Sequence, residues 1–572
     1  MKLFFYQSIL TFLLTCSSLH SLDTKSGLKS TKTSREINAI SLDMFTRPSR
    51  GWNAWFAYDI HLDEVGMRSN ADSLVRLGLS SLGFQFLNLD GGWQGGRDSN
   101  GNIYENATKF PSGLKALSSY VHSLGLLFGS YTDRGSRTCD NHVGSGGFYQ
   151  QDANSWASWP SDYVKVDSCG GVMSHSGAIA QFGAIQDAIN LTNRPMVYSL
   201  CGWLKWYPQL ASIANVGNSW RIGPDALSWD NVLMNFDAAA DAWPYVGPGK
   251  YADIDEIMGP SRGRPISYEQ TLTQVAMIAV IGSPMLLSFD LTNLTVNDPD
   301  VTPFLNEEML DIHWDTLPHG PVFRKFVGGY VSSDRWSPYT DLQCNASDPN
   351  VQWRFLPTSD NTTGYLSSVG FSGTCLYAGA AWTGECNNAQ AVWVAECGSN
   401  LCCNENCTSM QVKLNNDGTI TTIYGVPNNN APGPYLTLDI NPNTLFWEER
   451  YNGTNGDPNR QLWSFNKETG MLSSIATGLC LGAKPSDDMN VWGRALFDGS
   501  TAFVFANFNQ NNDKNITCDS TCFIDAGYNM TTTFIVRDIW AKTDIGIATV
   551  NEGYTVLVTR NGASRFLKFT PQ

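Results

Sequence analysis

The stretch DYVKVD at residues 162–167 is short and largely apolar, and it ends on Lys165 and Asp167. Four further runs of this character are separated from it and from one another by helical patterns: FQFLNLD (84–90), LLFGSYTD (126–133), PMVYSL (195–200) and SPMLLSFD (283–290). Short apolar runs that alternate with amphipathic segments indicate βα units, hence a parallel sheet with helices outside it. Because five or more such units over ~250–280 residues fit a closed barrel better than an open sheet, we predict a (β/α)8 barrel over residues 39–320.

Polar side chains gather at the carboxyl ends of these runs. They are Asp90, Tyr131 with Asp133, Lys165 with Asp167, and Ser199 with Cys201. In a barrel these strand ends converge on one face, where active sites lie. A single strand-end carboxylate is as often a helix N-cap or a turn residue. Four such positions in succession weaken that interpretation, so we expect a functional site at this face.

Residues 339–486 differ in composition from the barrel region, being rich in Cys, Asn, Gly and Thr. A loose repeat runs through them: VQWRF (351–355) leads to TCLYAG (374–379), and QLWSF (461–465) leads to LCLGA (479–483). A degenerate third copy, AVWVAE (391–396) with YLTLDI (435–440), lies between these two. Three such units predict an inserted β-trefoil-like domain of the ricin-B type, a fold that often binds sugars. A structural module without a ligand is an equally open interpretation.

The remaining segment, residues 488–572, alternates apolar and polar residues with the period of a strand. ALFDGSTAFVFANF (495–508) and GYTVLVTRNGASRFLKFTP (553–571) are its clearest stretches. Half-buried antiparallel strands give this alternation, so we predict a C-terminal antiparallel β-sandwich.

Residues 1–21 have the layout of a secretory signal peptide, with Lys2, an apolar run and then small polar residues. A signal anchor is the alternative, but the run is interrupted at Gln7 and Ser8 and is shorter than a membrane span. Sequons for N-glycosylation are numerous, at Asn106, Asn190, Asn293, Asn345, Asn361, Asn406, Asn452, Asn515 and Asn529. We therefore expect a protein that is secreted or is lysosomal or vacuolar, with no membrane partner.

Cysteine usage and charge agree with export. Removing Cys16 with the leader leaves 13 of the 14 cysteines, concentrated in the second half of the chain, which suits disulfides better than a metal site. The odd number leaves at least one thiol unpaired. The net charge of −16 disfavours nucleic acid and anionic membranes as partners. The few histidines are scattered, so we expect no metal and no organic cofactor.

Several motifs occur in an order that resembles the clan D α-galactosidase and α-N-acetylgalactosaminidase family, the melibiase type. They are GWNAW (51–55), LNLDGGW (87–93), YTDRGSRTC (131–139), GSGGFYQQDA (144–153), DYVKVDSC (162–169), SWRIGPD (219–225), GPGKYADIDEI (247–257), SPMLLSFDLTNL (283–294) and VWGRALFDGSTAFVFANF (491–508). The resemblance covers the barrel and roughly the last 80 residues, and the segment between looks like an insertion. It implies a retaining glycoside hydrolase that cleaves terminal α-D-galactose-like residues of an oligosaccharide or glycoconjugate.

Carried onto this sequence, the resemblance implies that Asp167 is the nucleophile and Asp225 the general acid/base of a double displacement. Lys165 would hold sugar hydroxyls and keep the nucleophile ionised. The guanidinium of Arg221 offers donors to a hydroxyl and a carboxylate together. The other implied substrate-binding residues are Trp55, Asp90, Tyr131, Cys201, Gly202, Trp203 and Asp255. Ordinary core packing is the alternative role for Trp55.

The same resemblance implies a disulfide between Cys139 and Cys169 beside the nucleophile. Cys201 also matches a family cysteine, but the usual partner position is occupied by Gly217. Cys201 is therefore our candidate for the unpaired thiol.

Two departures from the family pattern concern the substrate. The second of two paired aspartates is replaced by Gly91, and a glutamate of α-galactosidases is replaced by Gly202. Each change removes a hydroxyl acceptor, and Gly202 is expected to open space for a larger 2-substituent or another pyranose. Specificity for α-N-acetylgalactosaminides or β-L-arabinopyranosides, transglycosylation, and a sugar-binding protein without catalysis stay open as alternatives. The oligomeric state stays open too.

Overall fold

The computed structural model describes most of the chain beyond residue 44. The described residues are 45–172, 175–202, 207–315, 323–326, 339–358, 363–378, 392–397, 411–422, 437–440, 445–448, 450–451, 453, 457–483 and 489–572. The chain divides into residues 1–43 and 44–572, and all described residues belong to the second unit. The expected leader at 1–21 and the site residue Trp203 lie outside the described residues.

The predicted barrel is confirmed: eight parallel strands form one sheet in the order β10-β1-β2-β5-β6-β7-β8-β9. The strands are β1 (Arg50–Asn53), β2 (Phe86–Asn88), β5 (Leu127–Asp133), β6 (Tyr163–Asp167), β7 (Val197–Cys201), β8 (Ser219–Arg221), β9 (Tyr251–Asp253) and β10 (Met285–Leu287). A parallel bridge between Ile257, just after β9, and Leu287 joins the two ends of the sheet. The strand ends therefore meet around one mouth.

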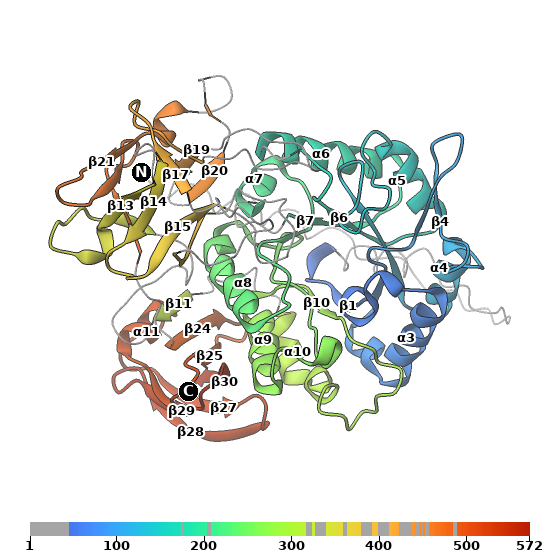
Figure 1. The fold of residues 1–572 in the computed structure, drawn as a ribbon. Coiled ribbons are helices and arrows are strands. Elements are labelled where there is room, and N and C mark those ends of the chain that lie inside the picture. The colour runs from blue at the N-terminus through green and yellow to red at the C-terminus, as the bar shows by residue number, and fades with distance from the viewer. Residues whose placement is uncertain are drawn as a thin grey trace, which may run out of the picture. The chain divides into compact units, whose positions relative to one another are not determined.

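A helix follows every strand of the barrel, and these helices surround the sheet (Figure 1). They are α3 (Glu64–Arg76), α4 (Leu114–Ser123), α5 (Tyr149–Ser158), α6 (His175–Leu191), α7 (Tyr207–Ala214), α8 (Trp229–Ala242), α9 (Tyr268–Ile281) and α10 (Glu307–His313). The short helix α2 (Trp55–Tyr58) and the hairpin β3 (Gln94–Arg97) with β4 (Ile103–Glu105) lie in the connections.

Helix α9 shows how local sequence positions one of these elements. Ser267 caps its first turn by accepting from the backbone of Gln270, whose side chain bonds back to Ser267. Gly282 ends the helix with a φ of 73°, a conformation that costs glycine little. Between these caps the helix is apolar on almost every side and is buried, because strands of the C-terminal domain cover the face turned away from the barrel.

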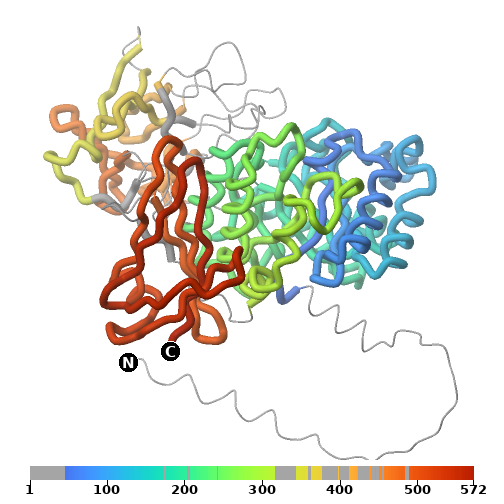
Figure 2. The backbone as a smooth tube through the Cα atoms, turned by 90° about the horizontal axis from the view of Figure 1, so that it is seen from below, coloured from blue at the N-terminus to red at the C-terminus, as the bar shows by residue number. Residues whose placement is uncertain are grey.

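The C-terminal antiparallel domain is also confirmed (Figure 2). Its main sheet has the order β11-β24-β25-β30-β27-β28, and β26 pairs with β29. The bounds are β11 (Phe323–Phe326), β24 (Met489–Ala495), β25 (Thr501–Asn507), β26 (Lys514–Cys518), α11 (Ser520–Asp525), β27 (Thr533–Asp538), β28 (Thr543–Thr549), β29 (Tyr554–Val558) and β30 (Ala563–Pro571). Because β11 pairs with β24, this sheet begins before the inserted segment and resumes after it.

In its described residues the inserted segment consists of β-strands with two short 3₁₀ helices, Pro349–Val351 and Pro458–Gln461. Its strands are β12 (Tyr339–Leu342), β13 (Trp353–Pro357), β14 (Thr363–Ser368), β15 (Thr374–Ala378), β16 (Val392–Glu396), β17 (Gln411–Leu414), β18 (Ile420–Thr422), β19 (Thr437–Ile440), β20 (Leu445–Glu448), β21 (Trp463–Phe465), β22 (Leu472–Ser474) and β23 (Cys480–Gly482). Its first strand pairs with its last, and a disulfide joins Cys344 to Cys480. The β-trefoil and the domain boundaries stay predictions.

Candidate active site

A cavity of about 210 Å³ lies at the carboxyl ends of the barrel strands. It is lined by most of the residues that the sequence analysis singled out, namely Trp55, Asp90, Tyr131, Lys165, Asp167, Cys201, Arg221, Asp225 and Asp255. Gly202 is not among its lining residues. Cys139, expected only as a disulfide partner, also lines the cavity, together with four residues that the sequence did not single out: Asp140, Leu227, Glu256 and Arg262.

Asp167 is held at the end of β6 by two hydrogen bonds. The Tyr131 hydroxyl donates to its Oδ2 at 2.9 Å, and the Ser168 backbone N–H donates to its Oδ1 at 3.0 Å. Tyr131 lies on the adjacent strand β5, where it pairs in register with Lys165. Strand pairing therefore brings the hydroxyl donor within reach of this carboxylate.

Burial raises the pKa of Asp167 to about 7. The negative charges of Asp133 and Asp90 also raise this pKa. The positive charge of Lys165 and the hydrogen bond from Tyr131 lower it. A carboxyl group poised in this range ionises near neutral pH, a property that is common in groups at functional sites.

Lys165 lies between two carboxylates. Its Nζ is 2.7 Å from Asp90 Oδ2 and 3.3 Å from Glu256 Oε1. Burial by itself would lower the pKa of Lys165, but Asp90 and Glu256 raise it well above its usual value. Asn53 also donates to Asp90 Oδ2, at 3.0 Å. The ammonium group is therefore fixed in position and charged.

Arg221, at the end of β8, bridges Asp225 and Asp255. Its NH2 is 2.6 Å from Asp225 Oδ1, and its NH1 is 2.7 Å from Asp255 Oδ1. The Asp225 side chain is 26% exposed, whereas that of Asp255 is 1% exposed. Burial raises the pKa of Asp255 to about 7. Of the two carboxyl groups, Asp225 is therefore the more accessible one.

Asp255 adopts a backbone conformation that is rare for a residue with a side chain, with a φ of 83°. Its Oδ2 accepts from the Ala226 backbone N–H, and its own N–H donates to Asp253 Oδ1 at 2.8 Å. Such strain persists where surrounding contacts enforce it, and it gathers at active sites and ligand clamps.

A disulfide joins Cys139 to Cys169, with the Cα atoms 5.0 Å apart. These two cysteines lie close to Asp133 and Asp167, but the bonded sulfurs offer no thiolate ligands, so this cluster is unsuited to a metal ion. Among the described cysteines, Cys201 has no disulfide partner. Burial raises the pKa of its thiol well above the usual value, which keeps it unreactive.

The expectation that Gly202 opens space for a larger glycone is wrong. A β-carbon at this position would lie 2.0 Å from the ring of Tyr207, so the tyrosine already fills the volume. Tyr207 is buried, and its hydroxyl lies 3.3 Å from that of Ser168. At Gly91 a β-carbon would lie 3.1 Å from a carboxylate oxygen of Asp140. Both glycines are therefore packed against neighbouring side chains.

The residues that the sequence analysis missed gave little local signal. Glu256 directly follows Asp255 inside a motif already quoted, and Asp140 directly follows Cys139. Burial raises the pKa of Glu256 to about 8. Neither residue stands at the end of an apolar run, so only the folded arrangement reveals that they face the cavity.

A closed parallel barrel with several carboxyl groups in one cavity at its strand ends is the arrangement that barrel-type glycoside hydrolases have. Comparison with known proteins gives the particular family. Residues 57–315 match the model described as alpha galactosidase A, and residues 486–566 match the alpha galactosidase C-terminal beta sandwich domain. The chain belongs to this α-galactosidase family.

Curated relatives agree with this assignment. A probable alpha-galactosidase of Dictyostelium discoideum is 32% identical over 295 residues, covering 51% of this chain and 75% of that protein. Alpha-galactosidase A of Cellvibrio japonicus is 32% identical over 325 residues, covering 54% and 78%. The unmatched part of this chain includes the inserted segment, which neither family model covers.

Solved structures share the fold. Alpha-galactosidase I from Mortierella vinacea superimposes with a TM-score of 0.59 at 19% identity, covering 92% of this chain and 98% of that one. A β-L-arabinopyranosidase from Geobacillus stearothermophilus gives 0.56 at 15% identity, covering 93% and 98%. Because such low identities show the fold alone, they do not distinguish between these glycones.

Proposed function

We propose that this protein hydrolyses terminal α-D-galactose-like residues with retention, Asp167 acting as nucleophile and Asp225 as general acid/base. The observation that carries the proposal is that both carboxyl groups line one small cavity at the barrel mouth. Retaining glycosidases need such a pair, one carboxylate to attack and one carboxyl group to transfer a proton.

The surroundings of the two groups support these separate roles. Asp167 is 6% exposed and receives hydrogen bonds on both oxygens, so its attacking atom is fixed in direction. Asp225 has one oxygen held by Arg221 and a more exposed side chain, which suits proton exchange with a leaving group and then with water.

The proposed reaction has two steps at the anomeric carbon. A carboxylate oxygen of Asp167 bonds to the anomeric carbon while the bond to the leaving oxygen breaks and that oxygen takes the proton of Asp225. A water molecule then gives a proton to Asp225, and its oxygen displaces Asp167 from the same carbon. The second inversion restores the starting configuration, which is net retention.

The α-D-galactose-like glycone is proposed from the names of the curated relatives, which are α-galactosidases. The β-L-arabinopyranosidase and the putative α-N-acetylgalactosaminidase among the solved structures mark the alternative glycones.

A panel of aryl glycosides tests the proposal: α-D-galactoside, α-N-acetylgalactosaminide and β-L-arabinopyranoside. We expect turnover of the galactoside and a loss of about 1,000-fold or more in kcat in Asp167→Ala. Asp225→Ala should lose about 100- to 10,000-fold with a poor leaving group, and much less with dinitrophenolate, which needs no proton. An inert wild-type protein, or full activity in Asp167→Ala, would contradict the proposal.

We also propose that the protein reaches a secreted or vacuolar location. Within the described part of the chain, no helix combines the length and apolar character of a membrane span. Expression in a eukaryotic secretory host, with a gel shift on enzymatic removal of N-glycans, tests this directly. Retention inside the cell without glycans would contradict it.

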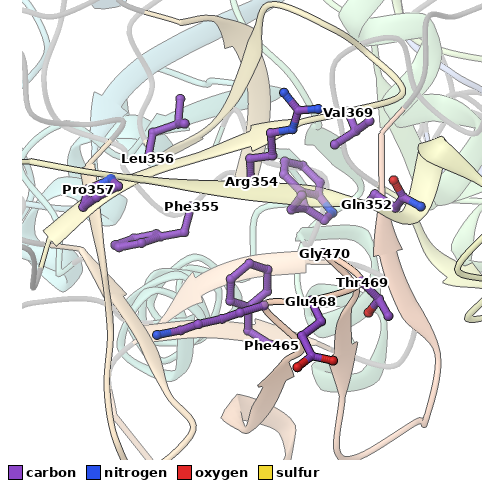
Figure 3. Close-up of a pocket in the computed structure, with 12 residues that line it drawn as sticks. Gln352, Arg354, Phe355, Leu356, Pro357, Val369, Phe465, Glu468, Thr469 and Gly470 are labelled. Carbon is purple, nitrogen blue, oxygen red and sulfur yellow. The ribbon is translucent and has the colours of Figure 1, made fainter.

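We further propose that the insertion is a β-trefoil with a sugar-binding cavity of its own. The Trp353 indole donates to Leu481 O at 2.9 Å and the Trp463 indole to Leu438 O at 3.0 Å, a repeated contact that supports internal symmetry. A cavity of about 670 Å³ lies between the β13 and β21 regions. In Figure 3, Phe355 and Phe465 lie toward the space between these two regions, as aromatic rings that pack on sugar faces would.

The full chain tests this second function in an Asp167→Ala background, where turnover is removed. We expect retention on immobilised galactose, weakened about tenfold or more by Phe355→Ala with Phe465→Ala. Ile475→Ala, which removes an exposed apolar side chain of the insertion that does not line this cavity, is the control. Equal retention of all variants would contradict sugar binding at this cavity.

A further inference from the structure

The barrel cavity contains a carboxylate that the double displacement does not use. Asp140 lies in the loop between β5 and α5 and lines the cavity together with Asp90 and Tyr131. Its side chain is only 6% exposed. A carboxylate in such a place must be compensated by partners, or it would destabilise the fold.

Two side chains of the same loop fix the orientation of Asp140. The Thr138 hydroxyl donates to its Oδ1, and the His142 ring Nδ1 donates to its Oδ2 at 2.7 Å. The neighbouring Cys139 is tied to Cys169 beside the nucleophile. A carboxylate has about four acceptor positions, so each oxygen of Asp140 can still accept another hydrogen bond.

Gly91 makes room for this carboxylate. A β-carbon on Gly91 would lie 3.1 Å from Asp140 Oδ2 and 3.2 Å from Asp140 Cγ, closer than ordinary packing allows. Asp90, the residue before Gly91, already binds Lys165 in the cavity. The volume beside Asp90 is thus occupied by an acceptor that comes from a different loop.

We propose that Asp140 accepts a hydrogen bond from a hydroxyl group of the bound glycone and thereby contributes to the choice of sugar. This inference rests on the proposed hydrolase function, because it assigns a substrate contact inside the same cavity. A preorganised acceptor discriminates strongly, since a glycone that lacks the matching hydroxyl leaves it unpaired.

The first experiment compares wild type, Asp140→Ala and Asp140→Asn on aryl α-galactoside and on its monodeoxy analogues. We expect Asp140→Ala to lose about 10- to 100-fold in kcat/KM on the parent sugar. For one deoxy analogue the kcat/KM of wild type should be low, and Asp140→Ala should not lower it further. The hydroxyl missing from that analogue is the one that Asp140 binds. Asp187→Ala, an exposed aspartate on α6, is the control and should match wild type.

The second experiment moves the carboxylate. Gly91→Asp alone should lose activity, because its β-carbon would lie 3.1 Å from Asp140 Oδ2 and the new carboxylate would crowd the old one. Gly91→Asp combined with Asp140→Ala should recover to within about tenfold of wild type, since the acceptor returns from the neighbouring loop. A purely structural role for Asp140 predicts that the double variant is no more active than Asp140→Ala alone.

The outcomes separate the two proposals. If wild type turns over none of the sugars, the hydrolase proposal fails before Asp140 is tested. If wild type is active and Asp140→Ala loses the same factor on every deoxy analogue, or loses nothing, the substrate contact is overturned. Melting temperatures of all variants show whether a loss of activity is only a loss of folded protein.

Discussion

At the scale of single residues, Tyr131 helps to determine how readily Asp167 ionises. Burial raises the pKa of Asp167 to about 7, and the Tyr131 hydrogen bond, which favours the charged carboxylate, keeps it from rising further. In Tyr131→Phe the pKa should rise further, so the acid limb of the kcat/KM profile should move to higher pH by roughly half a unit or more.

The measurement is a pH–rate profile with aryl galactoside between about pH 4 and 9. Tyr149→Phe, which removes a hydroxyl bonded to the Arg134 backbone outside the cavity, should leave the limb in place. An acid limb that stays fixed or moves to lower pH in Tyr131→Phe would show that Asp167 does not control it.

Gly202 gives a second prediction at this scale. Because a β-carbon there would lie 2.0 Å from the Tyr207 ring, Gly202→Ala should destabilise the protein by about 1–3 kcal/mol. Urea unfolding measures the change. Gly183→Ala, whose new β-carbon would meet only Val216 at 3.9 Å, should be neutral or slightly stabilising.

Replacement of Tyr207 provides the counterpart to the Gly202 experiment. Gly202→Ala should lower the free energy of unfolding by less in a Tyr207→Ala background, because the ring that the new β-carbon would clash with is absent. Equal costs in both backgrounds would mean that the conformation of the loop, and not the tyrosine, excludes a side chain.

These residues also show how far the site could be predicted. Resemblance selected Asp90, Lys165 and Arg221, because each belongs to a short motif that survives in the sequence. It could not reveal Asp140, whose approach to Gly91 joins two loops that are distant in the chain. It also misjudged Gly202, since only the fold brings the Tyr207 ring against it.

At the scale of elements, Arg494 on β24 links the C-terminal sheet to two barrel helices. Its buried guanidinium donates to the Ala279 carbonyl of α9 at 2.9 Å and to the Ile312 carbonyl of α10 at 3.0 Å. Both carbonyls lie near helix carboxyl ends, which attract positive charge and lack intrahelical donors. Burial lowers the pKa of Arg494 to about 10.

Arg494→Met should therefore destabilise the protein by about 2–4 kcal/mol, since it leaves buried carbonyl groups without their donor. Chemical unfolding measures this change. Arg565→Met, which removes a partly exposed ion pair with Asp538, should cost less than about 1 kcal/mol. A small effect of Arg494→Met would mean that water replaces the guanidinium at this interface.

Elements differed in how well their sequences predicted them. Strands β5 and β6 are buried along almost all of their length and begin as apolar runs, so they were visible in the sequence. Strand β11 was missed, since it has four residues and its partner β24 follows only after the whole insertion. Local patterns carry no information about pairing at such a separation.

At the scale of the whole molecule, several buried carboxyl groups favour their neutral form in the folded state. Burial raises the pKa of Asp133 to about 6, of Asp167 and Asp255 to about 7, and of Glu256 to about 8. The folded protein therefore binds more protons than the unfolded chain between about pH 4 and pH 8. The free energy of unfolding should fall as the pH rises through this window.

Calorimetry at about pH 5 and pH 8 tests this, and the melting temperature should be lower at pH 8 by about 2 °C or more. Asp133→Asn removes one of these carboxyl groups without changing the proposed sugar contacts. The difference in melting temperature between pH 5 and pH 8 should therefore be smaller in this variant. A protein that is more stable at pH 8 than at pH 5 would contradict the assignment of raised pKa values.

The seam formed by β12 with β23, closed by the Cys344–Cys480 bond, also governs how the chain can be assembled. Strand β11 can pair with β24 only after the whole insertion has been synthesised. If the insertion were an unfolded loop, closing it to form this pair would carry a large entropic cost. Because the β12–β23 pairing and the disulfide hold the first and last strands of the insertion together, the insertion connects β11 to β24 as a short loop would. A lineage could therefore gain or exchange this module without redesigning the sheet that carries it.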